Sequence, residues 1–97
     1  MHQTIIRAVQ EKSVLEIQYH GYTRLVEPHA YGVTTKHRDA IRCYQTAGGS
    51  VSGESPAWKL LCIDEAVSIK VTDAKFAHPR PGYQRNDSGM IRIYEQL

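Results

Sequence analysis

The stretch that decides the fold is LEIQYHGYTRLVEPHAYGVT, residues 15–34. Over 15–20 apolar and polar side chains alternate, which is typical of a strand with one buried face. Gly21 then marks a turn, and β-forming residues resume over 23–34. Pro28 has no backbone donor, so this second strand is predicted to lie at an edge of the sheet or to bend at a bulge.

The flanking residues extend a mainly β pattern. An apolar stripe over residues 3–12 predicts a short N-terminal helix. Three further strands are predicted downstream, over 40–46, 58–63 and 66–72. In the last of these, Val67, Ile69 and Val71 alternate cleanly. Residues 47–56 are rich in Gly and Ser and lack apolar side chains that would order a loop by burial, so we expect mobility there.

The C-terminal residues break the strand pattern. Two prolines in HPRPG, residues 78–82, remove backbone donors and fix backbone angles, so residues 77–97 are expected to wrap around the domain as an extended strap. Within it, the apolar residues over 89–97 fit either a last strand or a helical turn.

Together these elements predict one domain over residues 1–97, with its core over about 3–76. A chain of 97 residues has room for one hydrophobic core. One helix and about five short strands joined by short turns predict a mainly β fold in which a small, strongly bent barrel closes its sheet and hides its edges.

Composition limits the classes of function. The net charge of +2 is too small to predict a nucleic-acid-binding protein by itself, so any anion site must be local. Cys43 and Cys62 lie in apolar runs and are predicted to be core residues; a disulfide would need them to face each other on neighbouring strands. No signal peptide or membrane-spanning run is recognisable, so we expect a cytoplasmic protein with no membrane partner.

The sequence contains no recognisable motif for catalysis or for metal binding. The five histidines show neither HxxxH spacing nor a nearby pair of cysteines, so no metal site is predicted. The serines of the Gly-rich loop and Cys62 lack a nucleophile elbow or an evident base. We therefore expect a protein that is not an enzyme, with no catalytic residues and no cofactor.

Two neighbouring strands carry candidate binding residues. Arg42 and Tyr44 share the face opposite Ile41 and Cys43, where a guanidinium would grip a phosphate and a ring would stack on a base. The alternative is an ordinary solvated strand face. Arg24 and His29 lie an odd number of residues apart, so only a bulge near Pro28 would bring them to one groove; the alternative role for His29 is a capping or turn hydrogen bond. Trp58 would line such a groove or anchor the core or its rim, and the same alternatives hold for Tyr83 and Tyr94.

The order and spacing of four segments resemble the WYL-domain family. These segments are LEIQY (15–19), RLVEPH (24–29), IRCYQ (41–45) and WKLLCID (58–64), and the resemblance covers residues 3–76. It implies an Sm-like small barrel of the kind found in bacterial transcription regulators and phage-defence systems, which senses nucleic-acid or nucleotide ligands through a basic and aromatic groove. The segment RPGY (80–83) with Asp87 and Met90 is also similar to the ends of some stand-alone proteins with this domain.

Carried over by position, the resemblance implies a specific groove. Its residues would be Tyr19, Arg24, His29, Arg42, Tyr44 and Lys59. The chain departs from the family pattern at Glu65 and Ala66, where a basic residue and an isoleucine are usual, and a carboxylate there would oppose an anion. The 97 residues contain no winged-helix region of the regulator type.

The leading expectation is a ligand-sensing module that binds a nucleotide or single-stranded nucleic acid. Arg24, Arg42 and Lys59 would neutralise phosphates while Tyr19 and Tyr44 stack on bases. The alternative is a protein-interaction module or homodimer that pairs through an exposed barrel edge or the C-terminal strap. Salt separates the two, because phosphate contacts weaken steeply as salt rises and apolar contacts hardly respond.

Overall fold

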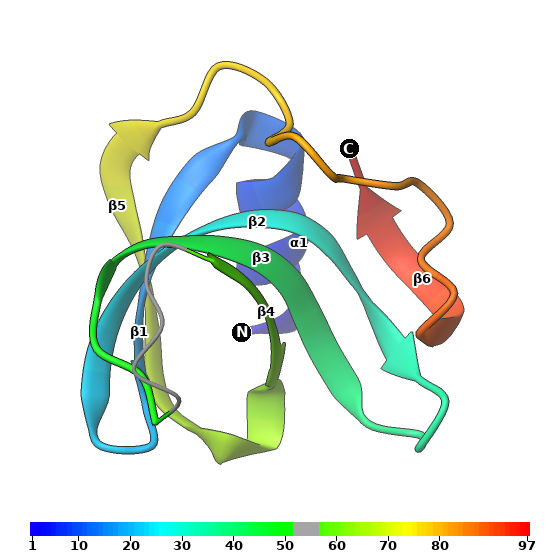
Figure 1. Ribbon diagram of the computed structural model, residues 1–97, viewed down its shortest axis with the longest axis horizontal. Helices are drawn as coiled ribbons and strands as arrows, with labels where there is room; N and C mark the ends of the chain where they lie inside the picture. Colours follow the sequence, from blue (N-terminus) through cyan, green and yellow to red (C-terminus); the bar gives the residue numbers. More distant parts are fainter. Residues whose placement is uncertain (52–56) are drawn as a thin grey trace.

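The computed structural model describes residues 1–51 and 57–97, which form one α-helix and a six-stranded antiparallel sheet (Figure 1). The mainly β fold and the N-terminal helix predicted from the sequence are confirmed. In chain order the elements are α1 (His2–Glu11), β1 (Ser13–Tyr19), β2 (Tyr22–Thr34), β3 (Asp39–Gly48), β4 (Ala57–Cys62), the 3₁₀ turn η1 (Ile63–Glu65), β5 (Ala66–Lys75) and β6 (Met90–Gln96).

Helix α1 buries its apolar stripe against the sheet. Ile5, Ala8 and Val9 are each at most 1% exposed and join the core formed by the inner side chains of the strands. The helix ends at Glu11 and is capped by Lys12, which adopts a left-handed conformation with φ 53°. The backbone N–H groups of this cap donate to the carbonyls of Ala8 and Val9. The chain then reverses directly into β1.

The sheet is organised around the long strand β2. Its first half pairs with β1 through a two-residue turn in which His20 and Gly21 both have positive φ, the geometry that matches strand twist in a hairpin. Its second half, from Ala30 to Thr34, pairs with β6. Strand β3 follows its other edge, and the register there shifts between Pro28 and Ala30. Of the two alternatives predicted for Pro28, the structure therefore has the bulge, because β2 lies inside the sheet and is not an edge strand.

The sheet is open, so the prediction of a closed barrel is not met. The strand order is β4-β3-β2-β1-β5, and β4 and β5 form its two ends. Over residues 1–51 and 57–97 no ladder joins these ends, and the last strand pairs with β2 and extends neither of them. Strand β5 is therefore exposed: Ile69 packs on the core, but Val67 is 84% and Val71 50% exposed, so the clean alternation of the three does not bury them equally.

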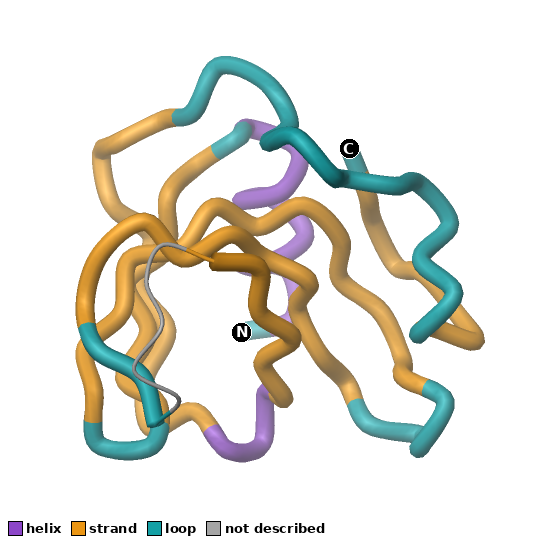
Figure 2. Tube along the Cα trace, viewed as in Figure 1, coloured by secondary structure: helices purple, strands orange, loops and turns teal. Residues whose placement is uncertain are grey.

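The chain beyond β5 divides into two parts. Residues 76–89, which we call the β5–β6 connection, form no strand and pass over the sheet as an extended segment (Figure 2). This part agrees with the predicted strap. Residues 90–96 instead form strand β6, which decides between the two alternatives left open by the sequence.

The Gly/Ser-rich segment is packed where it leaves β3. Residues 52–56 of the predicted mobile loop lie outside the described residues. Before them, Ser50 is buried and the amide of Gln45 donates to the carbonyl of Gly49 at 3.0 Å, so the expected lack of packing is wrong there. Gly48 has φ +95°, and a Cβ at this position would lie 2.0 Å from the carbonyl oxygen of Thr23. Backbone contact, which needs no apolar side chain, orders this part of the chain.

Both cysteines are free thiols. Cys43 is buried in the core, and Cys62 lies opposite Ala40 in the β3–β4 ladder, so the two do not form a facing pair. No helix in the described part of the chain is long and apolar enough to cross a membrane.

Candidate functional site

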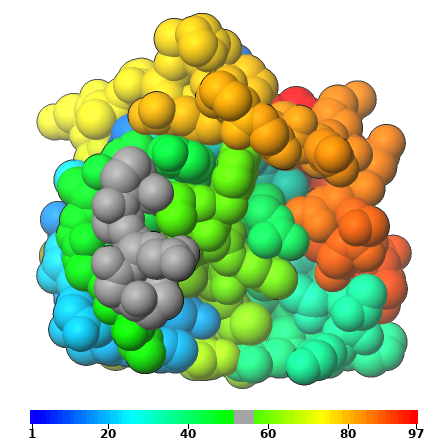
Figure 3. Space-filling model, viewed as in Figure 1, coloured from blue at the N-terminus to red at the C-terminus, as the bar shows by residue number. Residues whose placement is uncertain are grey.

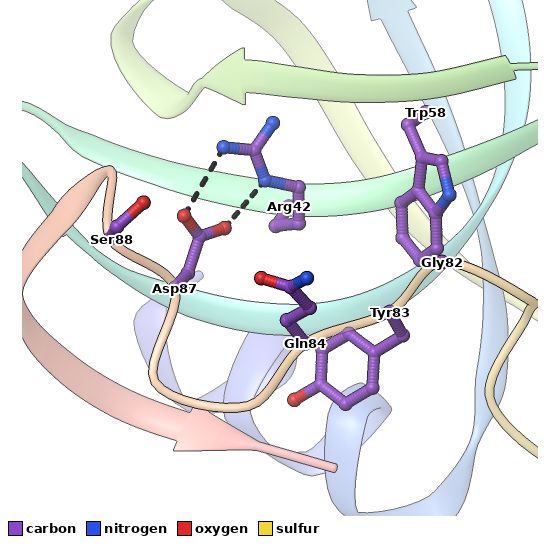
Figure 4. Close-up of a pocket in the computed structure, with 7 residues that line it drawn as sticks. All are labelled: Arg42, Trp58, Gly82, Tyr83, Gln84, Asp87 and Ser88. Atoms are coloured by element: carbon purple, nitrogen blue, oxygen red, sulfur yellow. Dashed lines mark hydrogen bonds and ion pairs between the residues drawn. The ribbon is translucent and has the colours of Figure 1, made fainter.

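A hollow of about 210 Å³ lies between the outer face of the sheet and the β5–β6 connection (Figure 4). Figure 3 shows this connection, in yellow to orange, running along the face beside β4. The residues that line the hollow are Arg42, Trp58, Gly82, Tyr83, Gln84, Asp87 and Ser88.

Strands β3 and β4 supply the floor of the site. Because side chains alternate along β3, Ile41 and Cys43 enter the core while Arg42 and Tyr44 face outward, as the sequence predicts. Tyr44 lies opposite Trp58 in the β3–β4 ladder, and the two rings meet edge to face with centroids 5.4 Å apart. A cation and two aromatic rings therefore share one face.

The connection contributes a carboxylate to Arg42. Arg42 Nε donates to Asp87 Oδ2 at 2.6 Å, and Nη2 donates to Oδ1 at 3.3 Å, which makes a forked ion pair. Asp87 is well covered, with its side chain 12% exposed. The Arg42 guanidinium holds the pKa of Asp87 below its usual range, although burial acts in the opposite direction.

An aromatic wall faces this ion pair. The rings of Trp58 and Tyr83 are within 26° of parallel, with centroids 6.3 Å apart. Trp58 Nε1 donates to the carbonyl of Pro81 at 3.2 Å. Gly82 makes this close approach possible, since it has φ +93° and a Cβ there would lie 3.2 Å from Trp58 Nε1.

His29 fastens the connection to the sheet. Its Nδ1 lies 2.8 Å from the carbonyl oxygen of Glu27, and its Nε2 lies 3.0 Å from the backbone N–H of Arg80. A carbonyl only accepts and an N–H only donates, so the ring is neutral with its proton on Nδ1. Burial lowers the pKa of His29, in agreement with this state. The ring also stacks on Phe76 with centroids 5.3 Å apart.

A second ion pair lies beside His29. Arg80 Nε donates to Glu27 Oε1 at 2.7 Å, and Nη2 donates to Oε2 at 3.0 Å. The same guanidinium lies over the ring of Tyr44, 4.8 Å from its centroid. The connection is thus held by two ion pairs of opposite polarity. In one the sheet supplies the carboxylate, Glu27, and in the other it supplies the guanidinium, Arg42.

Two of the predicted site residues lie elsewhere. The Arg24 guanidinium packs over the ring of Tyr19 at 5.0 Å and donates through Nη2 to the Tyr19 carbonyl at 3.2 Å. Arg24 is 3% exposed, and within residues 1–51 and 57–97 its Nε has no hydrogen-bond partner. Tyr19 accepts the N–H of Cys62 through its hydroxyl at 3.1 Å. None of these contacts is shared with His29, so the bulge does not join Arg24 and His29 in one groove.

The remaining predicted residue, Lys59, lies opposite Cys43 in the β3–β4 ladder. It follows Trp58 directly, so its side chain leaves the other face of the strand and does not line the hollow. The six predicted residues thus fall into a Tyr19–Arg24 pair, a group of three around the connection, and Lys59.

Sequence reasoning missed most of the residues that the connection supplies. Tyr83 was a groove candidate with the same alternative as Trp58, and it does line the hollow. Gln84, Asp87 and Ser88 also line it, yet they were predicted only as part of a strap. The available signal was local: polar and aromatic residues follow directly after Gly82, the point at which the chain turns toward Trp58.

The described residues contain no group of three His, Cys, Asp or Glu side chains placed to hold a metal ion. No protein-family model, curated protein or solved structure matches the chain significantly. The resemblance to the WYL-domain family stays a prediction from the quoted segments.

Proposed function

We propose that this protein is a non-catalytic binding module that takes a nucleotide, or one nucleotide of a single strand, in the hollow beside Arg42. The observation that carries the proposal is the Arg42 guanidinium next to the Trp58 and Tyr83 rings in one cavity. A guanidinium binds phosphate as a fork, and aromatic rings stack on any base. These are the two chemistries that a nucleotide requires.

The size of the hollow limits the ligand. Its volume of about 210 Å³ is below the range of about 300–1,000 Å³ that is usual for sites enclosing a drug-sized molecule. It therefore suits no more than one nucleotide, bound partly inside, with the rest of a strand outside. Gln84 points its amide toward this space and offers both a donor and an acceptor to a base edge (Figure 4).

The wider biological setting rests on the family resemblance. The order of one helix, five antiparallel strands and a 3₁₀ turn between the fourth and fifth strands is compatible with an open form of the Sm-like architecture that the resemblance implies. From the resemblance we propose that the protein acts in the bacterial cytoplasm, in transcription regulation or phage defence. The free thiols of Cys43 and Cys62 suit a reducing compartment.

The test is a salt-dependent titration with a short, labelled single-stranded oligonucleotide. Arg42→Ala should weaken binding and lower the salt slope by about 0.7 for the phosphate contact that is lost. Trp58→Leu should cost roughly 1–3 kcal/mol of stacking and leave the slope unchanged. Arg92→Ala is the matched control, because it removes the same charge from β6, where Arg92 lies over Tyr94 away from the hollow.

Two results would reject this function. In one, the unchanged protein binds neither the oligonucleotide nor AMP at low salt. In the other, Arg42→Ala and Arg92→Ala lose the same amount of affinity, which would show that only overall charge matters.

A second candidate function rests on the exposed edge of the sheet. Strand β5 pairs with β1 alone among the described strands, and Val67 and Val71 are 84% and 50% exposed beside its free edge. Such an edge is a template for pairing with another strand, here that of a second copy. Sedimentation should then show a salt-insensitive dimer that Val67→Lys converts to monomer. A monomer at all concentrations would reject this candidate.

A further inference from the structure

We propose that Asp87 is a built-in competitor for the anion site: its carboxylate occupies the guanidinium edge of Arg42 that an incoming phosphate needs. This inference rests on the proposed function and adds its regulation. Both Asp87 oxygens are used, at 2.6 Å from Nε and 3.3 Å from Nη2 of Arg42. A phosphate that binds this edge as a fork has to displace them, because the edge holds one pair of acceptors at a time.

The connection also covers an aromatic ring beside this ion pair. The planar guanidinium of Arg80 covers the ring of Tyr44, 4.8 Å from its centroid. A base stacking on that ring would require the same place. The β5–β6 connection thus puts an anion on Arg42 and a planar group on Tyr44. Tyr44 does not line the hollow, so Trp58 and Tyr83 remain the rings on which a base would stack there.

Release of Asp87 leaves the sheet intact. Residues 76–89 form no strand, and other contacts keep the connection in place. Arg80 stays bound to His29 and Glu27, and at the ends the Phe76 N–H bonds to the Lys12 carbonyl and the Thr35 N–H bonds to the Gly89 carbonyl. A rotation of the Asp87 side chain frees Arg42 at the cost of the ion pair and of the 2.8 Å bond that Oδ1 accepts from the Gly89 N–H. The closed and open states therefore differ locally.

Competition predicts a definite change in affinity. When the binding-competent state is only a fraction of the population, the apparent Kd rises by the inverse of that fraction. Asp87→Asn keeps the shape of the side chain but removes its charge, so the oligonucleotide should bind at least about fivefold more tightly, within the usual range of coupling between sites.

The matched control is Asp73→Asn, which removes the same charge from an exposed position on β5, away from the residues that line the hollow. It should change affinity by less than about twofold, the screened effect of one distant charge. The double variant Arg42→Ala/Asp87→Asn should show no gain, because the gain requires the freed guanidinium.

A measurement on the unchanged protein supports the variants. The carboxyl carbon signal of Asp87 in NMR should titrate at low pH in the free protein and move toward the ordinary range for Asp when the oligonucleotide saturates the site. If this signal keeps its low titration midpoint with ligand bound, Asp87 still holds Arg42 and the competition is refuted.

The outcomes separate the two proposals. Equal binding by the unchanged protein and Asp87→Asn would overturn the competition while leaving the proposed function in place. Weaker binding by Asp87→Asn would also overturn it, because Asp87 would then position Arg42 for the ligand. If neither protein binds the oligonucleotide or AMP, the proposed function itself fails, and the competition fails with it.

Discussion

The two faces of strand β3 are held in different ways. The inner side chains Ile41 and Cys43 are fully buried among aliphatic and aromatic neighbours of the core. The outer side chains Arg42 and Tyr44 are half-buried and make a few directional contacts. Arg42 meets a carboxylate, and Tyr44 meets a ring edge and a guanidinium.

This difference separates stability from recognition. Apolar packing depends on volume and is not directional, so the inner face stabilises the fold and favours no particular ligand. Ion pairs and ring contacts have defined geometry and partners, so a ligand with the same chemistry as the partner could replace it. Under the proposed function, the outer face is the one that would exchange contacts.

The inner face should give the largest effect on stability. Ile41→Ala or Ile17→Ala is expected to lower the free energy of unfolding by about 2–5 kcal/mol, because each side chain is at most 1% exposed and its removal leaves a cavity. Ile69→Ala, on the partly exposed strand opposite Ile17, should cost less. Urea denaturation measures all three; a loss below about 1 kcal/mol at Ile41 would place that side chain outside the core.

The contact between His29 and the connection should make stability depend on pH. Burial lowers the pKa of His29 in the folded protein, so the unfolded chain binds its proton more readily. The stabilisation is present above about pH 6.5, the ordinary His value, and declines as the pH falls below it, by about 1.4 kcal/mol for each unit between the two pKa values.

Thermal or urea unfolding between about pH 7 and pH 5 measures this dependence on either side of the ordinary His pKa. His29→Phe should flatten the profile, whereas His37→Asn, in the exposed turn before β3, should keep it. An unchanged slope in His29→Phe would assign the pH dependence to other groups.

A smaller loss is expected from the aromatic wall. Trp58→Phe removes the hydrogen bond from the indole N–H to the Pro81 carbonyl and retains most of the ring contact. The net cost should be about 1 kcal/mol, typical of one hydrogen bond, and should appear in urea unfolding followed by circular dichroism. A loss as large as that at Ile41 would contradict the distinction between the two faces.

The smallest effect is expected at the free edge of the sheet. Val67→Thr should change the free energy of unfolding by less than about 0.5 kcal/mol, because the side chain is 84% exposed and both residues favour strands. Urea denaturation at two protein concentrations checks this. A larger loss at the higher concentration alone would show that the edge is covered by a second copy.

Local sequence signals predicted the parts of the fold that depend on neighbouring residues. Alternation over residues 40–46 assigned both faces of β3 correctly, because side-chain direction in a strand follows from position alone. Gly21 and Pro28 predicted a turn and a bulge for equally local reasons: backbone freedom at one and a missing donor at the other.

The rest depends on contacts between distant residues. Asp87 is 45 positions from Arg42, and no periodic pattern indicates that pairing. The open sheet was missed because closure depends on whether the two end strands, β4 and β5, meet, and no local pattern decides that. The site was therefore half predicted: Arg42, Trp58 and Tyr83 were candidates, and Gln84, Asp87 and Ser88 were not.

The attachment of the β5–β6 connection at both ends has a consequence for selectivity. Asp87 is held close to Arg42 by the rest of the connection, so it acts as if it were present at millimolar concentration or above, the value for a group on a short flexible link. Weakly bound anions of the cell, such as chloride or acetate, therefore lose to the tether at their ordinary concentrations. Under the proposed function, a ligand that contacts Arg42 and the rings together would gain from both contacts, so Asp87 would select for ligands that combine negative charge with an aromatic surface.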